Sequence, residues 1–178
     1  MGYVVPARHS DLVLGALHGG TKAAGVDSRV VESWKRCVEQ FHLDPEDAGE
    51  AQVIGRSALN ERREHCCHLV EMSKSEMTNL YQQVAGSGYS ILLTDNEGVV
   101  LNYVGDPLFT TAAASTGMQT GAIWTEQSQG TNGIGTCLVE KRPLVIHQRE
   151  HFFTKNTRLT CGAAPIFCPT GQIAGVLD

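Results

Sequence analysis

The sequence predicts an α+β domain in which helices come first and an antiparallel sheet of five or six strands follows. Two observations indicate this order. Apolar residues recur at helical spacing up to about residue 84, and beyond it apolar and polar residues alternate in short runs bounded by turn residues. A chain of 178 residues has the size of one domain and buries roughly 70% of its unfolded surface, so a core can form without a disulfide or a metal.

The first predicted helix begins behind Asp27 or Ser28, either of which can act as its N-cap. Before it, residues 1–26 are expected to form a partly ordered arm with one short helix near residues 11–17. The apolar residues of the first helix fall at helical spacing: Val30, Val31, Trp34, Cys37, Val38 and Phe41. Pro45 ends the helix, because proline disfavours helical geometry in the residue before it.

A second, longer helix is predicted from Ser57 to Val84. Its apolar stripe comprises Leu59, Cys66, Leu69, Val70, Met77, Leu80, Tyr81 and Val84. Positions 59, 66, 70, 73, 77, 80 and 84 approach a heptad repeat, with Ser73 as its weak point. Two interpretations stay open: the stripe packs against the sheet, or the helix pairs with its copy in a dimer. Residues 27–84 thus form a helical segment that precedes a core of residues 85–178.

The sheet is expected to begin after the glycines at positions 86 and 88, which end the second helix. Residues 89–94 and 99–104 flank a turn that Gly98 closes, which predicts a hairpin. Residues 106–120 should be helical or irregular, with Asp106 as a cap and Pro107 at the first helical position. A short helix is expected from about Ile134. The remaining strands are expected over residues 143–147, 160–167 and 172–178.

Charge and composition restrict the partners of the chain. The formal net charge of −5 and the pI near 5.8 argue against contact with a nucleic-acid backbone. No apolar run reaches the ~18 residues that a membrane span needs, and residues 12–17 are too short a run for a signal peptide. We therefore expect a cytoplasmic protein without a membrane partner. The six cysteines lack a Cys-x-x-Cys pair and are interpreted as small buried apolar residues.

A candidate binding site lies between residues 124 and 168. Glycines, threonines and an asparagine crowd the segment from Thr131 to Thr136, where the backbone can approach a ligand closely. Large apolar residues and imidazoles on both sides could form the walls of a pocket. The candidate ligand-binding residues are Trp124, Glu126, Thr131, Asn132, Gly133, Thr136, His147, His151, Phe152 and Cys161. Two alternatives stay open: Glu126 caps the following loop, and Asn132 shapes a tight turn.

These motifs resemble a known family. The stretches 124–126, 130–136, 150–153, 159–161 and 164–168, together with Ser33-Trp-Lys-Arg-Cys37, resemble the sensory GAF domain of sigma-54-dependent activators of the acetoin catabolism regulator type. The resemblance spans residues 27–178. One departure is Gly162, where the family pattern has serine, and the missing hydroxyl is expected to bear on ligand preference.

The resemblance implies a receptor. It implies a GAF-like fold with the N-terminal helices on one face of the sheet, and loops and short helices of residues 106–160 covering a ligand cavity on the other. The ligand would be a small polar metabolite, and the domain would dimerise through the helix at 57–84. It also implies a fragment of a longer regulator, whose missing ATPase and DNA-binding domains would contact sigma-54 RNA polymerase and DNA.

No enzymatic function is expected. No serine or cysteine stands in a nucleophile context, and no pair of carboxylates is placed for acid–base catalysis. The histidines and cysteines match no zinc-binding spacing, so neither a metal nor a cofactor is predicted. Two other functions remain as alternatives: a dimerisation module without a ligand, and a cysteine-based redox or nitric-oxide sensor.

Overall fold

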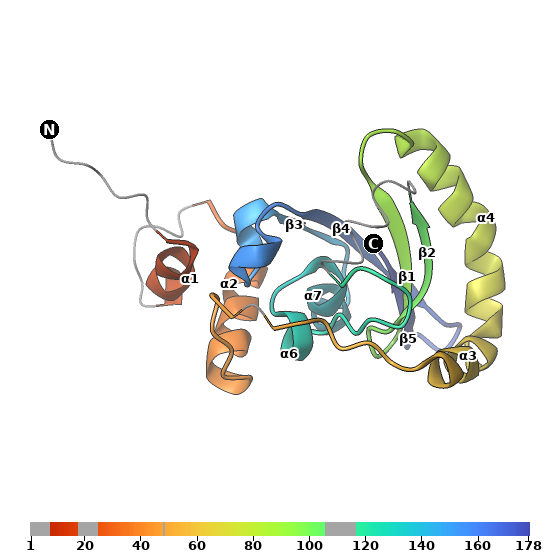
Figure 1. The fold of residues 1–178 in the computed structure, drawn as a ribbon, viewed down its shortest axis with the longest axis horizontal. Coiled ribbons are helices and arrows are strands. Elements are labelled where there is room, and N and C mark those ends of the chain that lie inside the picture. Colours follow the sequence, from red (N-terminus) through yellow and green to blue (C-terminus); the bar gives the residue numbers. More distant parts are fainter. Residues whose placement is uncertain (1–7, 18–24, 48, 106–116) are drawn as a thin grey trace, which may run out of the picture.

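The computed structural model describes residues 8–17, 25–47, 49–105 and 117–178. Its centre is a five-stranded antiparallel sheet in the order β2-β1-β5-β4-β3 (Figure 1). The strands are β1 (Ser90–Asp95), β2 (Val100–Gly105), β3 (Leu144–His147), β4 (Thr160–Phe167) and β5 (Ile173–Leu177). The predicted α+β class with an antiparallel sheet is therefore confirmed. Each strand begins and ends within one residue of its predicted limit.

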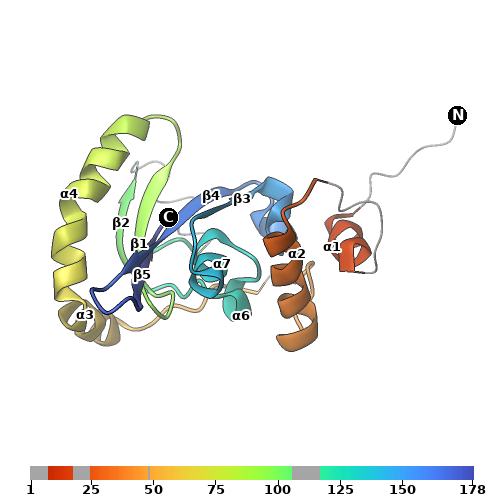
Figure 2. The same ribbon diagram turned by 180° about the vertical axis from the view of Figure 1, so that it is seen from behind.

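Helices α3 (Arg56–His65) and α4 (Cys67–Val84) cover one face of the sheet over β1 and β2, and we call this the outer face (Figures 1 and 2). Leu59 and Met77 are buried against the sheet, at 7% and 0% exposure. The described structure therefore uses these two positions of the stripe for core packing.

The prediction of one continuous helix over 57–84 is wrong, because the helix breaks at Cys66, whose φ and ψ are −96° and 22°. Tertiary contacts fix the direction of α3 independently of α4. Arg62 donates a hydrogen bond to Asp95 (2.7 Å), and Arg63 donates one to the carbonyl oxygen of Leu101 (2.7 Å). Helical periodicity does not encode these contacts with the β1–β2 hairpin.

The opposite, inner face is covered by α7 (Gly133–Glu140), which contacts β3, β4 and β5, and the short helix α6 (Glu126–Gln129) lies beside it. Two 3-10 turns, η3 (Gln148–Glu150) and η4 (Thr154–Asn156), follow β3. The helix predicted near residue 134 is thus confirmed as α7. Most of the prediction for residues 106–120 lies outside the described residues. Within the described ranges, no helix is long and apolar enough to cross a membrane.

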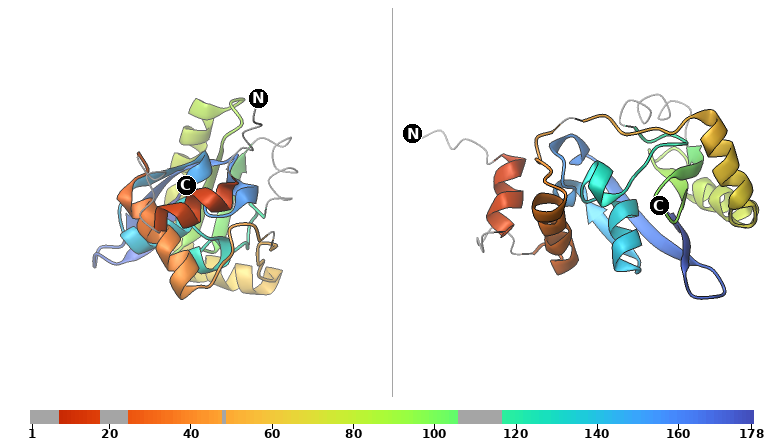
Figure 3. Two further views of the ribbon diagram at one scale, coloured as in Figure 1. Left: turned by 90° about the vertical axis from the view of Figure 1, so that its left-hand side faces the viewer. Right: turned by 90° about the horizontal axis from the view of Figure 1, so that it is seen from below.

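The first N-terminal helices lie at the far end of the molecule from α4 (Figures 1 and 3). They are α1 (His9–Leu17), α2 (Ser28–Lys35) and a π-helical turn η2 (Arg36–Gln40). Asp27 caps α2 by accepting a hydrogen bond from the backbone N–H of Arg29, as predicted. One detail differs from expectation: α2 contacts α7, and η2 contacts α6, so these elements do not share the outer face with α4.

Candidate functional site

A buried ion pair ties the N-terminal helices to α6. Glu126 is 2% exposed and accepts hydrogen bonds from Arg36 Nε at 2.7 Å and from Arg36 Nη2 at 2.9 Å. Arg36 Nη2 also lies 3.1 Å from Glu140 Oε1, at the end of α7. The pKa of Arg36 is raised, mainly by its hydrogen bonds to Glu126. Glu126, predicted to bind a ligand or cap a loop, therefore has a guanidinium as its partner.

Hydroxyl groups extend this ion pair into a buried network. Ser33 Oγ donates to Glu126 Oε1 at 2.6 Å and lies 2.7 Å from Thr131 Oγ1 and 3.3 Å from Thr136 Oγ1. The three hydroxyl side chains are fully buried, and Glu126 is 2% exposed. The structure thus brings three of the predicted site residues together, around a serine of α2. Buried polar groups need such partners, because an unpaired one costs about 1–3 kcal/mol.

Asn132 shapes the backbone ahead of α7. Its side-chain oxygen accepts a hydrogen bond from the N–H of Gly135 at 2.8 Å, which makes it the N-cap of the helix. Its amide nitrogen donates to the carbonyl oxygen of Gly130 at 2.8 Å. Asn132 therefore shapes the turn into α7, which is the structural alternative left open by the sequence.

Trp124 and Phe152 belong to the hydrophobic core. Trp124 is 2% exposed, and its indole N–H donates to the carbonyl oxygen of Gly117 at 3.1 Å. Phe152 is fully buried beneath Gly130, whose φ is 63°; a Cβ there would lie 2.6 Å from Phe152 Cβ. The loop between α6 and α7 thus rests directly on the phenyl group.

The two predicted histidines occupy different environments. His147 is exposed, and its Nδ1 lies 3.0 Å from the hydroxyl of Thr160. His151 is fully buried, and its Nδ1 lies 3.0 Å from the carbonyl oxygen of Gln148. Burial lowers the pKa of His151 to about 4, so its imidazole is neutral near pH 7. His9 of α1 lies 2.8 Å from the carbonyl oxygen of His151, which ties α1 to this loop.

Cys161 lines a cavity of about 240 Å³ on the inner face of the sheet. The cavity lies between β1, the start of β4 and the residue that follows β5. Its walls include the apolar side chains of Leu92, Met118 and Leu159 and the exposed side chain of Arg158. Small-molecule sites are concave and mostly apolar, with a few placed polar groups. The volume lies below the usual ~300–1,000 Å³ of drug-sized ligands and suits a molecule of a few heavy atoms.

Asp178 also lines this cavity and was not predicted as a site residue. Its Oδ1 is buried and has no hydrogen-bond partner among the described residues. Burial raises the pKa of Asp178 to about 6, and a hydrogen bond from the Cys161 thiol lowers it by a smaller amount. Gly133, a predicted site residue, begins α7 beside both groups: a Cβ on it would lie 2.3 Å from Asp178 Oδ1 and 2.6 Å from Cys161 Cβ.

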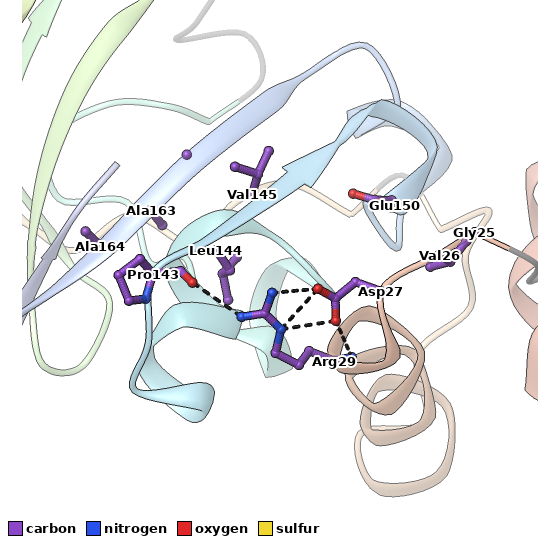
Figure 4. A pocket seen from close by; sticks show the side chains of 11 residues that line it. Gly25, Val26, Asp27, Arg29, Pro143, Leu144, Val145, Glu150, Ala163 and Ala164 are labelled. Carbon is purple, nitrogen blue, oxygen red and sulfur yellow. Dashed lines mark hydrogen bonds and ion pairs between the residues drawn. The ribbon is translucent and has the colours of Figure 1, made fainter.

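A second, wider hollow of about 950 Å³ lies between the start of α2 and strands β3 and β4 (Figure 4). Three charged residues line it: Asp27, Arg29 and Glu150. Asp27 and Arg29 bind each other, and Arg29 Nη1 donates to the carbonyl oxygen of Pro143 at 3.3 Å. Gly162 lines this hollow and has open space around a Cβ. The serine that the family pattern has at this position would therefore face away from the cavity of Cys161.

The cysteines differ in their environments. Burial raises the pKa of Cys37 and Cys137 to about 12 and that of Cys161 well above its ordinary value. The pKa of Cys168 is lowered, mainly by a hydrogen bond with Thr170 Oγ1. Among the described residues, no group of three or more His, Cys, Asp and Glu side chains could hold a metal ion.

The residues that the sequence did not assign are Ser33, Arg36 and Asp178. Ser33 and Arg36 lie in the motif Ser33-Trp-Lys-Arg-Cys37, which contributed to the family resemblance but gave no hint of a partner 90 or more residues away. Asp178 follows an apolar strand, and an isolated carboxylate at such a position carries no pattern. Its backbone pairs with that of Leu92 of β1, a register that only the structure reveals.

Comparison with known proteins shows that the chain is similar to part of several transcriptional regulators. The family model described as "MimR, N-terminal domain" matches residues 5–178. The acetoin catabolism regulatory protein of Cupriavidus necator is 38% identical over 152 residues, covering 85% of this chain and 23% of that protein. The propane 2-monooxygenase operon transcriptional activator MimR of Mycolicibacterium smegmatis is 30% identical over 174 residues, covering 97% of this chain and 28% of that protein.

The acetoin dehydrogenase operon transcriptional activator AcoR of Bacillus subtilis is 31% identical over 155 residues, covering 87% of this chain and 26% of that protein. The chain thus spans about a quarter of the length of these relatives. All three relatives are named as transcriptional regulators. A chain in the crystal structure of the E. coli DhaR(N)–DhaL complex shares the fold, with a TM-score of 0.80 at 15% identity over 85% of this chain and 51% of that one. The GAF-like fold expected from the sequence is confirmed.

Proposed function

Because the chain belongs to the family of MimR N-terminal domains, we propose that it senses a small-molecule effector within a sigma-54-dependent transcriptional activator. Its relatives establish the coarser part, a regulatory N-terminal domain of a transcriptional activator. One of them is named for acetoin catabolism, one for the acetoin dehydrogenase operon and one for a propane 2-monooxygenase operon. The proposed effector is a small polar metabolite.

The observation that carries the proposal is the 240 Å³ cavity at Cys161. Its apolar walls and polar residues match the composition of small-molecule sites. Of the ten residues predicted to bind the ligand, Cys161 lines this cavity and Gly133 lies against two of its walls. We therefore centre the site on β4 and the start of α7, and assign the network around Glu126 to holding the neighbouring elements in place.

In this proposal the effector shifts an equilibrium between two states of the domain. A ligand can do so only through its different affinity for the two states, and a coupling of about 1–3 kcal/mol is typical. The domain layout proposed for the regulator is an arm of residues 1–26, a helical segment of 27–84 and a sensor core of 85–178. ATPase and DNA-binding domains elsewhere in the regulator would contact the polymerase and DNA in the cytoplasm.

The test is a thermal-shift screen of short diols, hydroxyketones and small alcohols, followed by titration calorimetry of the compounds that raise the Tm. Leu159→Trp should fill the cavity and abolish binding. Val145→Trp is the matched control, because Val145 lies 59% exposed on the outer face, and it should leave binding unchanged. Sensing at this site is contradicted if no compound binds, or if Leu159→Trp binds as the native protein does.

We further propose that the domain forms a homodimer through the flank of α4 that borders β4 and β5. Met72 is 67% exposed on this helix, and it lines an apolar hollow of about 570 Å³ together with Phe167, which is 49% exposed. A second copy of the chain would cover both side chains. Light scattering over a concentration series should show a dimer that Met72→Glu weakens and Thr78→Glu does not, because Thr78 is exposed about 120° around the helix from Met72. A monomer at all concentrations contradicts this proposal.

A further inference from the structure

The hollow of about 570 Å³ beside α4 gathers three of the six cysteines. Cys66 and Cys67 line it from the junction of α3 and α4, and Cys168 lines it from the turn after β4. The other three cysteines lie in the core or on the inner face of the sheet. We propose that Cys67 and Cys168 are a redox pair: a peroxide oxidises Cys168, and the two thiols then form a disulfide across the hollow. This modification is separate from effector sensing at the cavity of Cys161.

Cys168 is the thiol that should react first. It lies directly after β4 and is partly exposed, and its sulfur is 2.9 Å from Thr170 Oγ1. The hydrogen bond with Thr170 is the main cause that lowers the pKa of Cys168, so it favours the thiolate, the form that attacks a peroxide. Among the described residues that line the hollow are the imidazoles of His65 and His68, and no carboxylate that would repel the thiolate.

Cys67 is the partner that should complete the disulfide. It is the first residue of α4 and is exposed. The neighbouring Cys66 is only partly exposed, and burial together with the carboxylate of Asp95 raises its pKa. A shielded thiol that stays protonated is the poorer nucleophile, so the structure favours Cys67 over Cys66.

The tip of the β4–β5 hairpin has the freedom that this disulfide needs. β5 pairs with β1 only over Gly175–Leu177, and β4 pairs with β3 only over Thr160–Ala163. In the described part of the chain, residues 167–174 therefore pair only with each other, and their turn projects beyond the other strands (Figure 3).

A bend at the base of this tip can bring the two thiols together. The register shifts between Ile166 and Phe167, and such irregularities bend a strand. A two-stranded ribbon is only marginally stable by itself. A disulfide needs Cα atoms within about 7 Å of each other, so the turn must close over the hollow towards α4. Met72 and Phe167 line the same hollow, so this closure competes with the proposed homodimer.

The reaction has two balanced steps. The Cys168 thiolate attacks one oxygen of hydrogen peroxide, the O–O bond breaks, and a sulfenic acid and a hydroxide ion form. The sulfur of Cys67 then attacks the sulfenic sulfur, and the hydroxyl group leaves as water with the thiol proton. The chain loses two hydrogen atoms, and the peroxide is reduced to water. A thiol reductant restores both cysteines.

The test is disulfide mapping of the dilute 178-residue chain after treatment with hydrogen peroxide and alkylation of the remaining thiols. Trypsin cleaves after Arg63, Lys74 and Arg158, so the expected product joins residues 64–74 to residues 159–178. Mass spectrometry should detect this product, and a thiol reductant should remove it. Cys67→Ser and Cys168→Ser should each abolish it, whereas the control variants Cys66→Ser and Cys161→Ser should retain it.

Several results would overturn the inference. They are the absence of the cross-linked product from the oxidised native chain, its survival in Cys67→Ser or Cys168→Ser, and a disulfide between Cys66 and Cys67. Pairs of chains joined by a disulfide on a non-reducing gel would place the bond between copies and have the same meaning. Circular dichroism establishes that each variant is folded. Effector binding is measured separately, so none of these results bears on the proposed sensing function.

Discussion

Replacing Arg36 with methionine should lower the free energy of unfolding by about 3–5 kcal/mol. Methionine retains an apolar stem but removes the guanidinium that binds Glu126 at 2.7 and 2.9 Å. The Glu126 carboxylate is 2% exposed, so water cannot replace its lost partner. Among the described residues, Ser33 would remain as the side chain that donates a hydrogen bond to it. The cost is therefore that of an unpaired buried charge.

The reverse change should cost less. In Glu126→Gln the side chain keeps its shape, and Arg36 keeps Glu140 at 3.1 Å and a side-chain exposure of 19%. We expect a loss of about 1–3 kcal/mol, the range for a broken hydrogen bond to a charged group. The double variant removes both charges, so it should be less destabilised than the sum of the single variants by about 0.5–3 kcal/mol.

Urea denaturation followed by circular dichroism measures these differences. In a domain of this size, 1 kcal/mol shifts the Tm by roughly 2–4 °C, so Arg36→Met should lower it by about 6–20 °C. Arg29→Met is the control, because Arg29 and Asp27 form an ion pair with 37% and 41% of their side chains exposed, worth at most about 1 kcal/mol. The reasoning fails if Arg36→Met is no more destabilising than Arg29→Met, or if the two single changes at Arg36 and Glu126 simply add.

Three further predictions follow from single residues. Gly130→Ala should cost about 1–3 kcal/mol more than Gly171→Ala, because both have positive φ but the new methyl group meets Phe152 only at Gly130; equal losses in urea denaturation would contradict the steric argument. Cys168 should be alkylated faster than Cys161, because its thiol pKa is lowered and that of Cys161 is raised; mass spectrometry of partly alkylated protein measures the order, and faster labelling of Cys161 would contradict it. The free energy of unfolding should fall by up to roughly 3 kcal/mol as the pH drops from about 6.5 to about 4, because the pKa of His151 is lower in the folded protein and the unfolded chain binds the extra proton. A His151→Asn variant should lose less stability over this pH range, and an equal loss would show that His151 is not the cause.

The strands could be predicted to within one residue because their alternation and turns are local properties of the chain. The break between α3 and α4 at Cys66 could not be predicted from the sequence. It follows from contacts of Arg62 and Arg63 with the β1–β2 hairpin, 33 and 38 residues further along the chain. In the same way, the position of α2 away from α4 depends on the partners of Ser33, which lie in α6, in the following loop and in α7.

The candidate site shows the same limit. The sequence correctly singled out the segment 131–136 as unusual, because glycine, threonine and asparagine are polar or flexible and stand close together. It could not tell whether their hydrogen bonds go to a ligand or to the protein. The partner of Thr131 and Thr136 is Ser33, about a hundred residues earlier, and that of Asn132 is the backbone of its own loop.

The placement of α7 has a mechanical consequence. Its first residue, Gly133, touches the walls of the cavity so closely that no methyl group fits, and its last residue, Glu140, shares the guanidinium of Arg36. The helix has eight residues, so these two points are joined by a stiff rod about 12 Å long. Any occupant that pushes the first turn away from Asp178 must tilt or slide this rod, and the movement reaches the end of α2 without passing through the sheet.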